Sequence, residues 1–120
     1  MSDLIILKGN PLSTSHIYKS FRNRVYLSKQ GKDLKQSYIE QAQEQWTKEV
    51  IECDVSVSVE FYFGDRRRRD IDNYNKLVLD SLNDIVWVDD VQIQELGLKK
   101  FYDKENPRTE VLIKKTATKA

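Results

Sequence analysis

The sequence predicts an α+β fold, a compact two-layer unit of two main helices and a mixed sheet in the order β-α-β-α-β-β. Residues 55–63 alternate apolar and polar side chains over nine positions, the period of a strand with one buried face. Residues 31–50 and 70–84 instead repeat apolar side chains at helical spacing. With 120 residues, we expect one domain spanning 1–120.

The amino-acid composition limits which class of protein this can be and which kinds of metal site it can form. No apolar run approaches the roughly 20 residues that span a bilayer, and residues 1–3 lack a basic leader, which predicts a cytoplasmic protein without a membrane partner. Cys53 is the only cysteine and His16 the only histidine, which excludes an internal disulfide and a cysteine-cluster zinc site. A metal site would use carboxylates, which favours Mg²⁺, with Mn²⁺ as a substitute. We expect no small-molecule cofactor.

Charge is segregated along the chain although the net charge is only +1. Residues 1–35 carry a net charge of +5 and residues 36–63 one of −5. This segregation is compatible with one side that faces phosphate and another that faces solvent or a partner. The alternative is a solvated basic face with no binding role.

The chain begins with a short apolar run, residues 4–7, which predicts a buried strand that ends at Gly9-Asn10-Pro11. Residues 12–26 show no clear periodicity and predict a loop, in which hydroxyls, cations and tyrosines are interleaved. Such a loop could contact phosphates and bases, or could be a polar surface loop. The candidate DNA-contacting side chains here are Ser13, Thr14, Ser15 and His16.

The first long helix is expected over residues 31–50, with Ser28 as its N-cap. Its apolar stripe predicts a core face formed by Leu34, Tyr38, Ala42 and Trp46. The strand at 55–63 follows and leads directly into Gly64 and an arginine run, Arg66, Arg67, Arg68 and Arg69. Functional loops are commonly held at the ends of such rigid elements.

A second helix is expected from about Asp70 to Asp84, which puts Asp70 and Asp72 at its positive N-terminal end. A short apolar piece, residues 86–88, precedes Asp89 and Asp90. Residues 91–100 predict a strand whose alternation slips near positions 94–95, as at a bulge. A turn at 103–107, a last strand at 109–114 and a frayed tail at about 115–120 complete the chain.

The block at residues 64–76 combines groups suited to metal-assisted chemistry on nucleic acid. Two carboxylates, Asp70 and Asp72, could bind a hard cation together with a further carboxylate from Asp89 or Asp90. Lys76 would neutralise a scissile phosphate or assist the attacking water, and the arginines would hold flanking phosphates as bidentate donors. This arrangement predicts a metal-dependent nuclease.

A purely structural interpretation remains open for the same residues. The two aspartates could cap a helix, Asp72, Lys76 and Asp80 form a suitable i,i+4 ladder, and Asp89 and Asp90 could make a turn. The arginines could form a solvated loop or a localisation-like patch. Caps and ladders do not, however, require four arginines beside the carboxylates.

The chain resembles the RusA family of Holliday junction resolvases. The residues that carry the resemblance are the block at 64–73 with Lys76, and the segment 87–92 with Trp87, Asp89 and Asp90. A looser similarity covers residues 11–13, Tyr18, residues 26–28 and Gly31, so that most of the chain takes part.

The resemblance implies a RusA-like, homodimeric, Mg²⁺-dependent endonuclease, bacterial or phage-encoded, that makes paired nicks in four-way junction DNA during recombination and repair. It implies the metal ligands Asp70, Asp72 and Asp90, with Lys76 as the catalytic lysine. DNA contacts are implied for the 13–16 loop and for residues 66–73, including Asn73. The chain has Ser15 and His16 where the family usually has asparagine and often a cation.

Two alternatives to a junction resolvase remain open at this stage. One is a related metal nuclease that cuts forks, flaps or duplex DNA, and the other is a DNA-binding module without catalytic activity. A homodimer suits a resolvase, because a four-way junction has approximate twofold symmetry and two opposed nicks need two equivalent sites.

Overall fold

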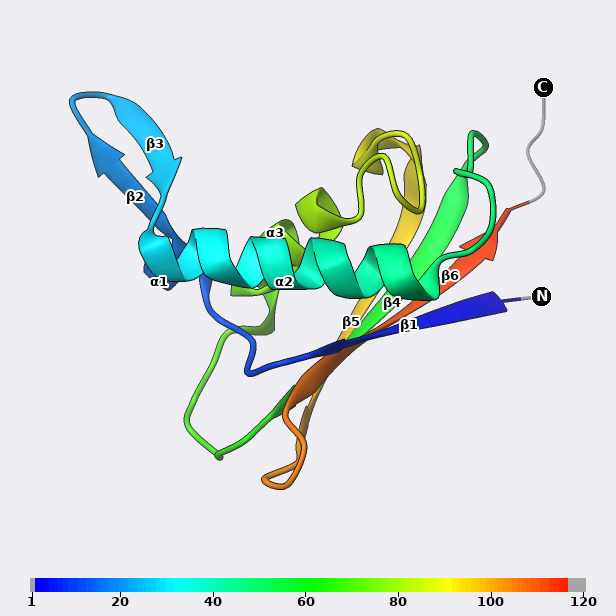
Figure 1. Ribbon diagram of the computed structural model, residues 1–120. Helices are drawn as coiled ribbons and strands as arrows, with labels where there is room; N and C mark the ends of the chain where they lie inside the picture. The colour runs from blue at the N-terminus through cyan, green and yellow to red at the C-terminus, as the bar shows by residue number, and fades with distance from the viewer. Residues whose placement is uncertain (1, 117–120) are drawn as a thin grey trace.

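The computed structural model describes residues 2–116 and contains a four-stranded mixed sheet in the order β1-β6-β4-β5 (Figure 1). The strands are β1 (Ser2–Lys8), β4 (Val55–Phe63), β5 (Ile93–Tyr102) and β6 (Arg108–Lys115). β6 pairs antiparallel with β1 and with β4, whereas β5 pairs parallel with β4. The predicted α+β class with a mixed sheet is confirmed.

The predicted strand at 55–63 is β4, with the same bounds. Its side chains alternate between buried and half-buried positions along all nine residues. In the pairing of β4 with β5, Val55 lies opposite Ile93 and Ser56 opposite Glu95, so Gln94 is an extra residue. This irregularity confirms the bulge expected near 94–95.

Two helices cover one face of the sheet, α2 (Lys29–Gln45) and the shorter α3 (Asn75–Ser81) (Figure 1). The Ser28 hydroxyl accepts a hydrogen bond from the Gly31 N–H at 3.1 Å, as expected of an N-cap. The predicted core face of α2 is also confirmed, since Tyr38, Ala42 and Trp46 are buried and Leu34 packs against the core.

Both helices are shorter than predicted. α2 ends at Gln45, not near position 50, because Trp46 is extended and the chain then turns so that the Ile51 N–H donates to the Val86 carbonyl at 2.8 Å. The helix expected from Asp70 begins as a 3₁₀ turn, η1 (Ile71–Asn73), and is interrupted at Tyr74.

The expectation of a loop over residues 12–26 is wrong. This segment forms a one-turn helix, α1 (Thr14–Ile17), and a hairpin of β2 (Tyr18–Phe21) and β3 (Arg24–Leu27), which the predicted element order therefore lacks. The hairpin turn is Arg22-Asn23, both with positive φ, 51° and 64°. Two-residue turns of this kind favour Asn-Gly, and exposed strands show no apolar alternation, so both sequence signals are missing.

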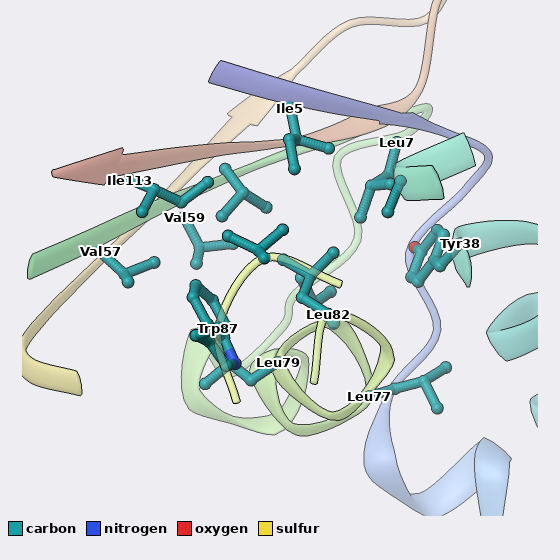
Figure 2. Close-up of a cluster of buried hydrophobic side chains, with 14 of the residues drawn as sticks. Ile5, Leu7, Tyr38, Val57, Val59, Leu77, Leu79, Leu82, Trp87 and Ile113 are labelled. Atoms are coloured by element: carbon teal, nitrogen blue, oxygen red, sulfur yellow. The ribbon is translucent and has the colours of Figure 1, made fainter. Parts of the chain in front are cut away.

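The core lies between the helices and the inner face of the sheet (Figure 2). Ile5 and Leu7 of β1 reach it from one edge of the sheet, and Tyr38 from α2. Trp87 is fully buried, and its indole N–H donates to Asn83 Oδ1 at 2.8 Å. The short apolar segment before Asp89 is therefore a core anchor that fixes the position of the residues after it.

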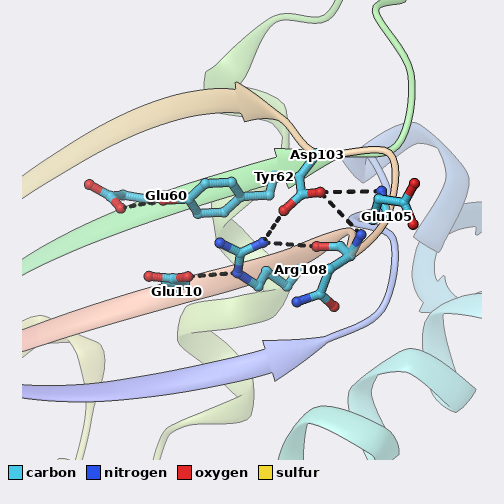
Figure 3. A network of polar contacts seen from close by, with 7 residues as sticks. Glu60, Tyr62, Asp103, Glu105, Arg108 and Glu110 are labelled. Atoms are coloured by element: carbon cyan, nitrogen blue, oxygen red, sulfur yellow. Dashed lines mark hydrogen bonds and ion pairs between the residues drawn. The ribbon is translucent and has the colours of Figure 1, made fainter.

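The opposite face of the sheet carries a polar network centred on Arg108 (Figure 3). Its guanidinium bonds Asp103 Oδ2 at 2.8 Å and Glu110 Oε2 at 2.6 Å, and lies 3.8 Å from the ring centroid of Tyr62. The hydrogen bond from Arg108 holds the pKa of Asp103 below its ordinary range, and backbone N–H groups of the turn lower it further. The network links the β5–β6 turn to the sheet.

This network predicts a loss of stability in acid. Because its pKa is lowered on folding, Asp103 contributes stability above its unfolded pKa of about 3.9 and loses that contribution as the pH falls through the lower, folded value. Asp103→Asn should therefore lower the thermal midpoint at pH 6, and the difference from wild type should shrink below pH 4. Glu105→Gln in the same exposed turn is the control, and should show no such convergence with pH.

At the C-terminal end, β6 continues through Lys115, and the Thr116 N–H donates to the Asp54 carbonyl. The remainder of the predicted tail, residues 117–120, lies outside the described residues. Within residues 2–116, no helix is long and apolar enough to cross a membrane.

Candidate active site

The arginine loop, residues 64–70, connects β4 to η1 and is held together from within. Asp65 Oδ1 accepts from the Arg67 N–H at 3.0 Å and pairs with Arg69 Nη2 at 2.8 Å. These contacts lower the pKa of Asp65, the Arg67 backbone bond most of all. The Arg69 guanidinium also lies 4.3 Å from the ring centroid of Phe63 at the end of β4. The loop therefore has a definite shape.

The four arginines are not equivalent. Arg69 keeps only 12% of its side chain exposed and also donates to two backbone carbonyls of its own loop. Arg66 stacks on Tyr102, with 4.2 Å between the guanidinium carbon and the ring centroid. Arg67 and Arg68 are exposed, Arg67 with 83% of its side chain in solvent. Arg68 has no partner within residues 2–116, and Arg67 makes only a long ion pair, 3.8 Å from its Nε to Asp65 Oδ2, so these two are the cations most available to an external phosphate.

The N-terminal segment, residues 10–17, includes α1 and lies against the arginine loop and η1, although some 60 residues separate them in sequence. The Thr14 hydroxyl donates to the Asn73 carbonyl at 2.8 Å. A pocket of about 280 Å³ is lined from one side by Ser13 and His16 and from the other by Arg67, Arg68 and Arg69, among others. Two groups of candidate DNA-contacting residues thus share one surface.

Hydroxyl groups organise the side of that pocket formed by the N-terminal segment. Ser13 Oγ lies 2.8 Å from His16 Nδ1 and 3.0 Å from Ser15 Oγ. The imidazole therefore presents its other nitrogen, Nε2, for contacts outside this cluster. Serine and histidine donors beside arginines form a surface suited to phosphate oxygens.

Asp70 and Asp72 are exposed, and neither side chain makes a hydrogen bond or ion pair within residues 2–116. Asp70 precedes η1 but forms no capping bond, and the residue before α3 is Tyr74. The interpretation of these aspartates as helix caps is therefore wrong. Both carboxylates remain available to a ligand.

Lys76, at the start of α3, is held by Asp80. Its ammonium lies 3.1 Å from Asp80 Oδ2, and the Tyr18 hydroxyl donates to the same oxygen at 3.1 Å. The Lys76 ammonium is also 5.3 Å from the Tyr18 ring centroid. Burial, followed by the charge of Asp80 and the hydrogen bond to it, raises the pKa of Tyr18 to about 12. Tyr18 therefore stays protonated at neutral pH and acts as a donor.

Asp89 and Asp90 have different environments. Asp89 caps the 3₁₀ turn η2 (Asp90–Gln92): its carboxylate accepts from the Val91 N–H, and Gln92 Oε1 accepts from the Asp89 N–H at 3.0 Å. Gln92 also donates to the Ile51 and Cys53 carbonyls. Asp89 thus has the turn-forming role that the structural interpretation offered for this pair.

Asp90 is half-buried, and the charges of other side chains act on its carboxyl. Burial raises the pKa of its carboxyl, a hydrogen bond with Asp89 and the negative charges of Asp80 and Asp89 raise it further, and the Lys76 ammonium opposes them. Asp90 is thus close enough to Asp80 and Lys76 to sense both charges, fourteen residues beyond Lys76 in sequence. Crowded carboxylates of this kind are typical of functional sites.

The donor set fits a hard divalent cation. Asp70 and Asp72 offer unpaired carboxylate oxygens. The negative charges of Asp80 and Asp89 act on Asp90, and a bound cation would offset their repulsion. Within residues 2–116, however, no three carboxylate, histidine or cysteine side chains are already gathered as a metal-binding group. The set of Asp70, Asp72 and Asp90 therefore stays a prediction.

Sequence reasoning missed the part played by Tyr18 and Asp80 in this site. The i,i+4 spacing of Lys76 and Asp80 predicted their ion pair, but only as one step of a surface ladder. The other step of that ladder, from Asp72, is not formed, because Asp72 lies in η1 before the α-helical register begins. Tyr18 had no signal in its spacing, since it reaches Asp80 from the hairpin, and was marked only by the looser similarity to the family.

Comparison with known proteins gives a consistent family assignment. Residues 8–114 match the family model described as Endodeoxyribonuclease RusA. The crossover junction endodeoxyribonuclease RusA of Escherichia coli (strain K12) is 27% identical over 104 residues, 86% of this chain and 87% of that protein. The protein of the same name from Enterobacteria phage 82 has the same identity and coverage. YqaN of Bacillus subtilis (strain 168), an uncharacterized protein, is 46% identical over 48 residues, 40% of this chain and 33% of YqaN.

Proposed function

Since this chain belongs to the RusA family of endodeoxyribonucleases, we propose that it resolves four-way (Holliday) junctions by Mg²⁺-dependent paired nicking during DNA recombination and repair. Its substrate is then junction DNA in the cytoplasm of a bacterium, and residues 1–120 form a single endonuclease domain. The names of the relatives from Escherichia coli and phage 82 support the junction as substrate.

One observation carries the catalytic part of the proposal. The charges of Lys76 and Asp80 both act on the pKa of Asp90, which supports a site shared by the last aspartate of the sequence signature and the candidate catalytic lysine. A pair of solvated aspartates in a surface turn would not need a lysine and a further aspartate whose charges act on it. Hydrolysis of a phosphodiester requires carboxylates and a cation that act on one phosphate, and the influence of these charges on one another supports such a site.

In the proposed site, Asp70, Asp72 and Asp90 would hold the divalent cation. A cation there supplies charge neutralisation at the scissile phosphate and lowers the pKa of water. Lys76 adds a positive charge at the same phosphate, and Asp80 holds its ammonium at 3.1 Å. The Tyr18 hydroxyl, which stays protonated, donates a hydrogen bond to the Asp80 carboxylate and holds it in place.

The DNA backbone is proposed to lie over the pocket between the arginine loop and the N-terminal segment. Arg67 and Arg68 are exposed there, and Ser13 and His16 line the same pocket from the other side. Arg69 positions the loop through Asp65 rather than offering all its donors to DNA. Such phosphate contacts give affinity that falls as salt rises.

Two active sites are needed for paired nicks, so we propose a homodimer. A single chain of 14.1 kDa offers one candidate site, whereas a junction presents two strands related by an approximate twofold axis. Sedimentation of the active protein should therefore give twice the mass of one chain. A species that is active with the mass of one chain would contradict this.

The test of function is a nicking assay on synthetic four-way junction, fork, flap and linear duplex substrates, with Mg²⁺, with Mn²⁺ and with a chelator. Symmetric cutting of the junction, lost with the chelator, is expected. Equal cutting of linear duplex would instead indicate a general nuclease. A folded protein that binds but cuts no substrate would be a DNA-binding module.

Lys76→Met is expected to lower the rate of junction cleavage by about a hundredfold or more, the scale measured when one charge-stabilising donor is removed. Affinity for the junction should change little, because Lys76 is one of many cations. The rate of single-turnover cleavage at saturating protein measures the effect. Lys104→Met in the exposed β5–β6 turn is the control, and an equal loss there would refute a catalytic role.

A further inference from the structure

The β2–β3 hairpin is a protruding element, and beyond Tyr18 at its root the proposed active site does not use it. It extends past the end of α2, away from the sheet (Figure 1). Its apolar side chains are in solvent: Phe21 is 62% exposed, Val25 72% and Tyr26 50%. Exposed aromatic groups on a projecting ribbon are typical of a contact surface.

The strand register shows which side chains lie on each of the two faces of the hairpin. Lys19 lies opposite Tyr26, and Phe21 opposite Arg24, so these four share one face in an alternation of cations and aromatic rings. Ser20 and Val25, opposite one another, are on the other face. Interleaved aromatic rings and cations are the side chains that bind bases and phosphates together.

The tip adds a further cation to the aromatic face. The Arg22 guanidinium carbon lies 5.2 Å from the Phe21 ring centroid, and the turn is formed by Arg22 and Asn23. No aspartate or glutamate occurs between residues 4 and 32. The charge of the ribbon is therefore complementary to a polyanion, and no acidic residue of that segment offsets it.

The root of the hairpin is fixed to the candidate active site. Tyr18 and Leu27 pair there and pack against the core, and the Tyr18 hydroxyl donates to Asp80, the partner of Lys76. The Ser28 N–H donates to the Ile17 carbonyl at 2.7 Å. A Cβ on Gly31 would lie 2.7 Å from that carbonyl oxygen, so α2 packs closely on the same segment.

We propose that Phe21 stacks on a base exposed at the branch point of junction DNA, while Lys19, Arg22 and Arg24 contact the flanking phosphates. Bases in linear duplex are stacked on both sides, whereas a branch point offers a base that an aromatic ring can reach. The hairpin thereby distinguishes branched from linear DNA, and its root places the cut strand at Lys76. This inference rests on the proposed function.

The experiment measures binding in EDTA, so that no DNA is cut, to a four-way junction with 2-aminopurine at the branch point and to a linear duplex of the same sequence. Phe21→Ala should weaken junction binding by about tenfold, should leave duplex binding within about twofold, and should abolish the change in 2-aminopurine emission. Phe21→Tyr should retain both properties. Val25→Thr, an isosteric change on the opposite face of the same ribbon, is the matched control.

Three results would overturn the proposal. These are unchanged junction binding and emission in Phe21→Ala, an equal loss for junction and duplex, and a change in oligomeric mass, which would mean that Phe21 contacts a second copy of the chain. Circular dichroism of each variant confirms that it is folded. Cleavage by the wild-type protein is measured separately. A protein that binds the junction through Phe21 but does not cut it would contradict the proposed function and leave the role of Phe21 intact.

Discussion

Asp70→Asn is expected to reduce junction cleavage at least about a thousandfold while junction affinity stays within about threefold of wild type. The substitution removes a negative charge directed at the proposed cation but keeps the shape of the side chain. Because the carboxylate is exposed and without a partner within residues 2–116, the free energy of unfolding should not change measurably. Single-turnover cleavage, equilibrium binding in EDTA and thermal unfolding measure the three quantities.

Asp84→Asn is the matched control for this change. Asp84 is an exposed aspartate shortly after α3, with a φ of 66° that asparagine also accepts. Its cleavage rate should equal that of wild type. If Asp70→Asn lost folding or DNA binding together with activity, Asp70 would have a structural role and the metal-ligand proposal would fail.

Trp87→Ala is expected to lower the free energy of unfolding by about 3–5 kcal/mol, the range for removing a large aromatic side chain from a core. Trp87 is fully buried, and its loss would also leave Asn83 Oδ1 without the indole donor. Domains of this size are stable by about 5–15 kcal/mol, so the variant should lie near its unfolding limit. Urea denaturation followed by circular dichroism measures the change.

Val88→Ala, at the neighbouring position, should cost less than about 1 kcal/mol, because Val88 is 47% exposed. The contrast between adjacent residues tests whether burial of Trp87 anchors the segment that leads to Asp90. Equal losses would mean that the segment is held by its backbone bridges to Ile51 and Asn83. Where Trp87→Ala is still folded at low temperature, its cleavage should fall because Asp90 is less firmly placed.

The sequence was most informative where a local pattern and the final environment agree. The alternation at 55–63 predicted β4 residue by residue, and the apolar stripe of α2 predicted the burial of Tyr38, Ala42 and Trp46. The bulge at Gln94 was also visible, as a slip in the pattern. In each case burial on one face of a regular element imposes a short period on the chain.

Features that depend on contacts between distant segments were not predictable in this way. The hairpin was missed because Arg22 and Asn23 occupy a turn that usually carries glycine, and because its strands bury almost nothing at the tip. The helix at Asp70 was placed too early, since the break at Tyr74 has no proline or glycine to announce it.

By itself, then, the sequence determined the sheet's central strand, the main helix and the types of charged group in the candidate site. Only the tertiary structure decided the roles of two of these groups: Arg69 as the internal support of its loop and Asp89 as a cap. It also brought Tyr18 from the hairpin to Asp80. The physical reason is that period and charge are properties of neighbouring residues, whereas desolvation and pairing arise only when segments remote in sequence pack together.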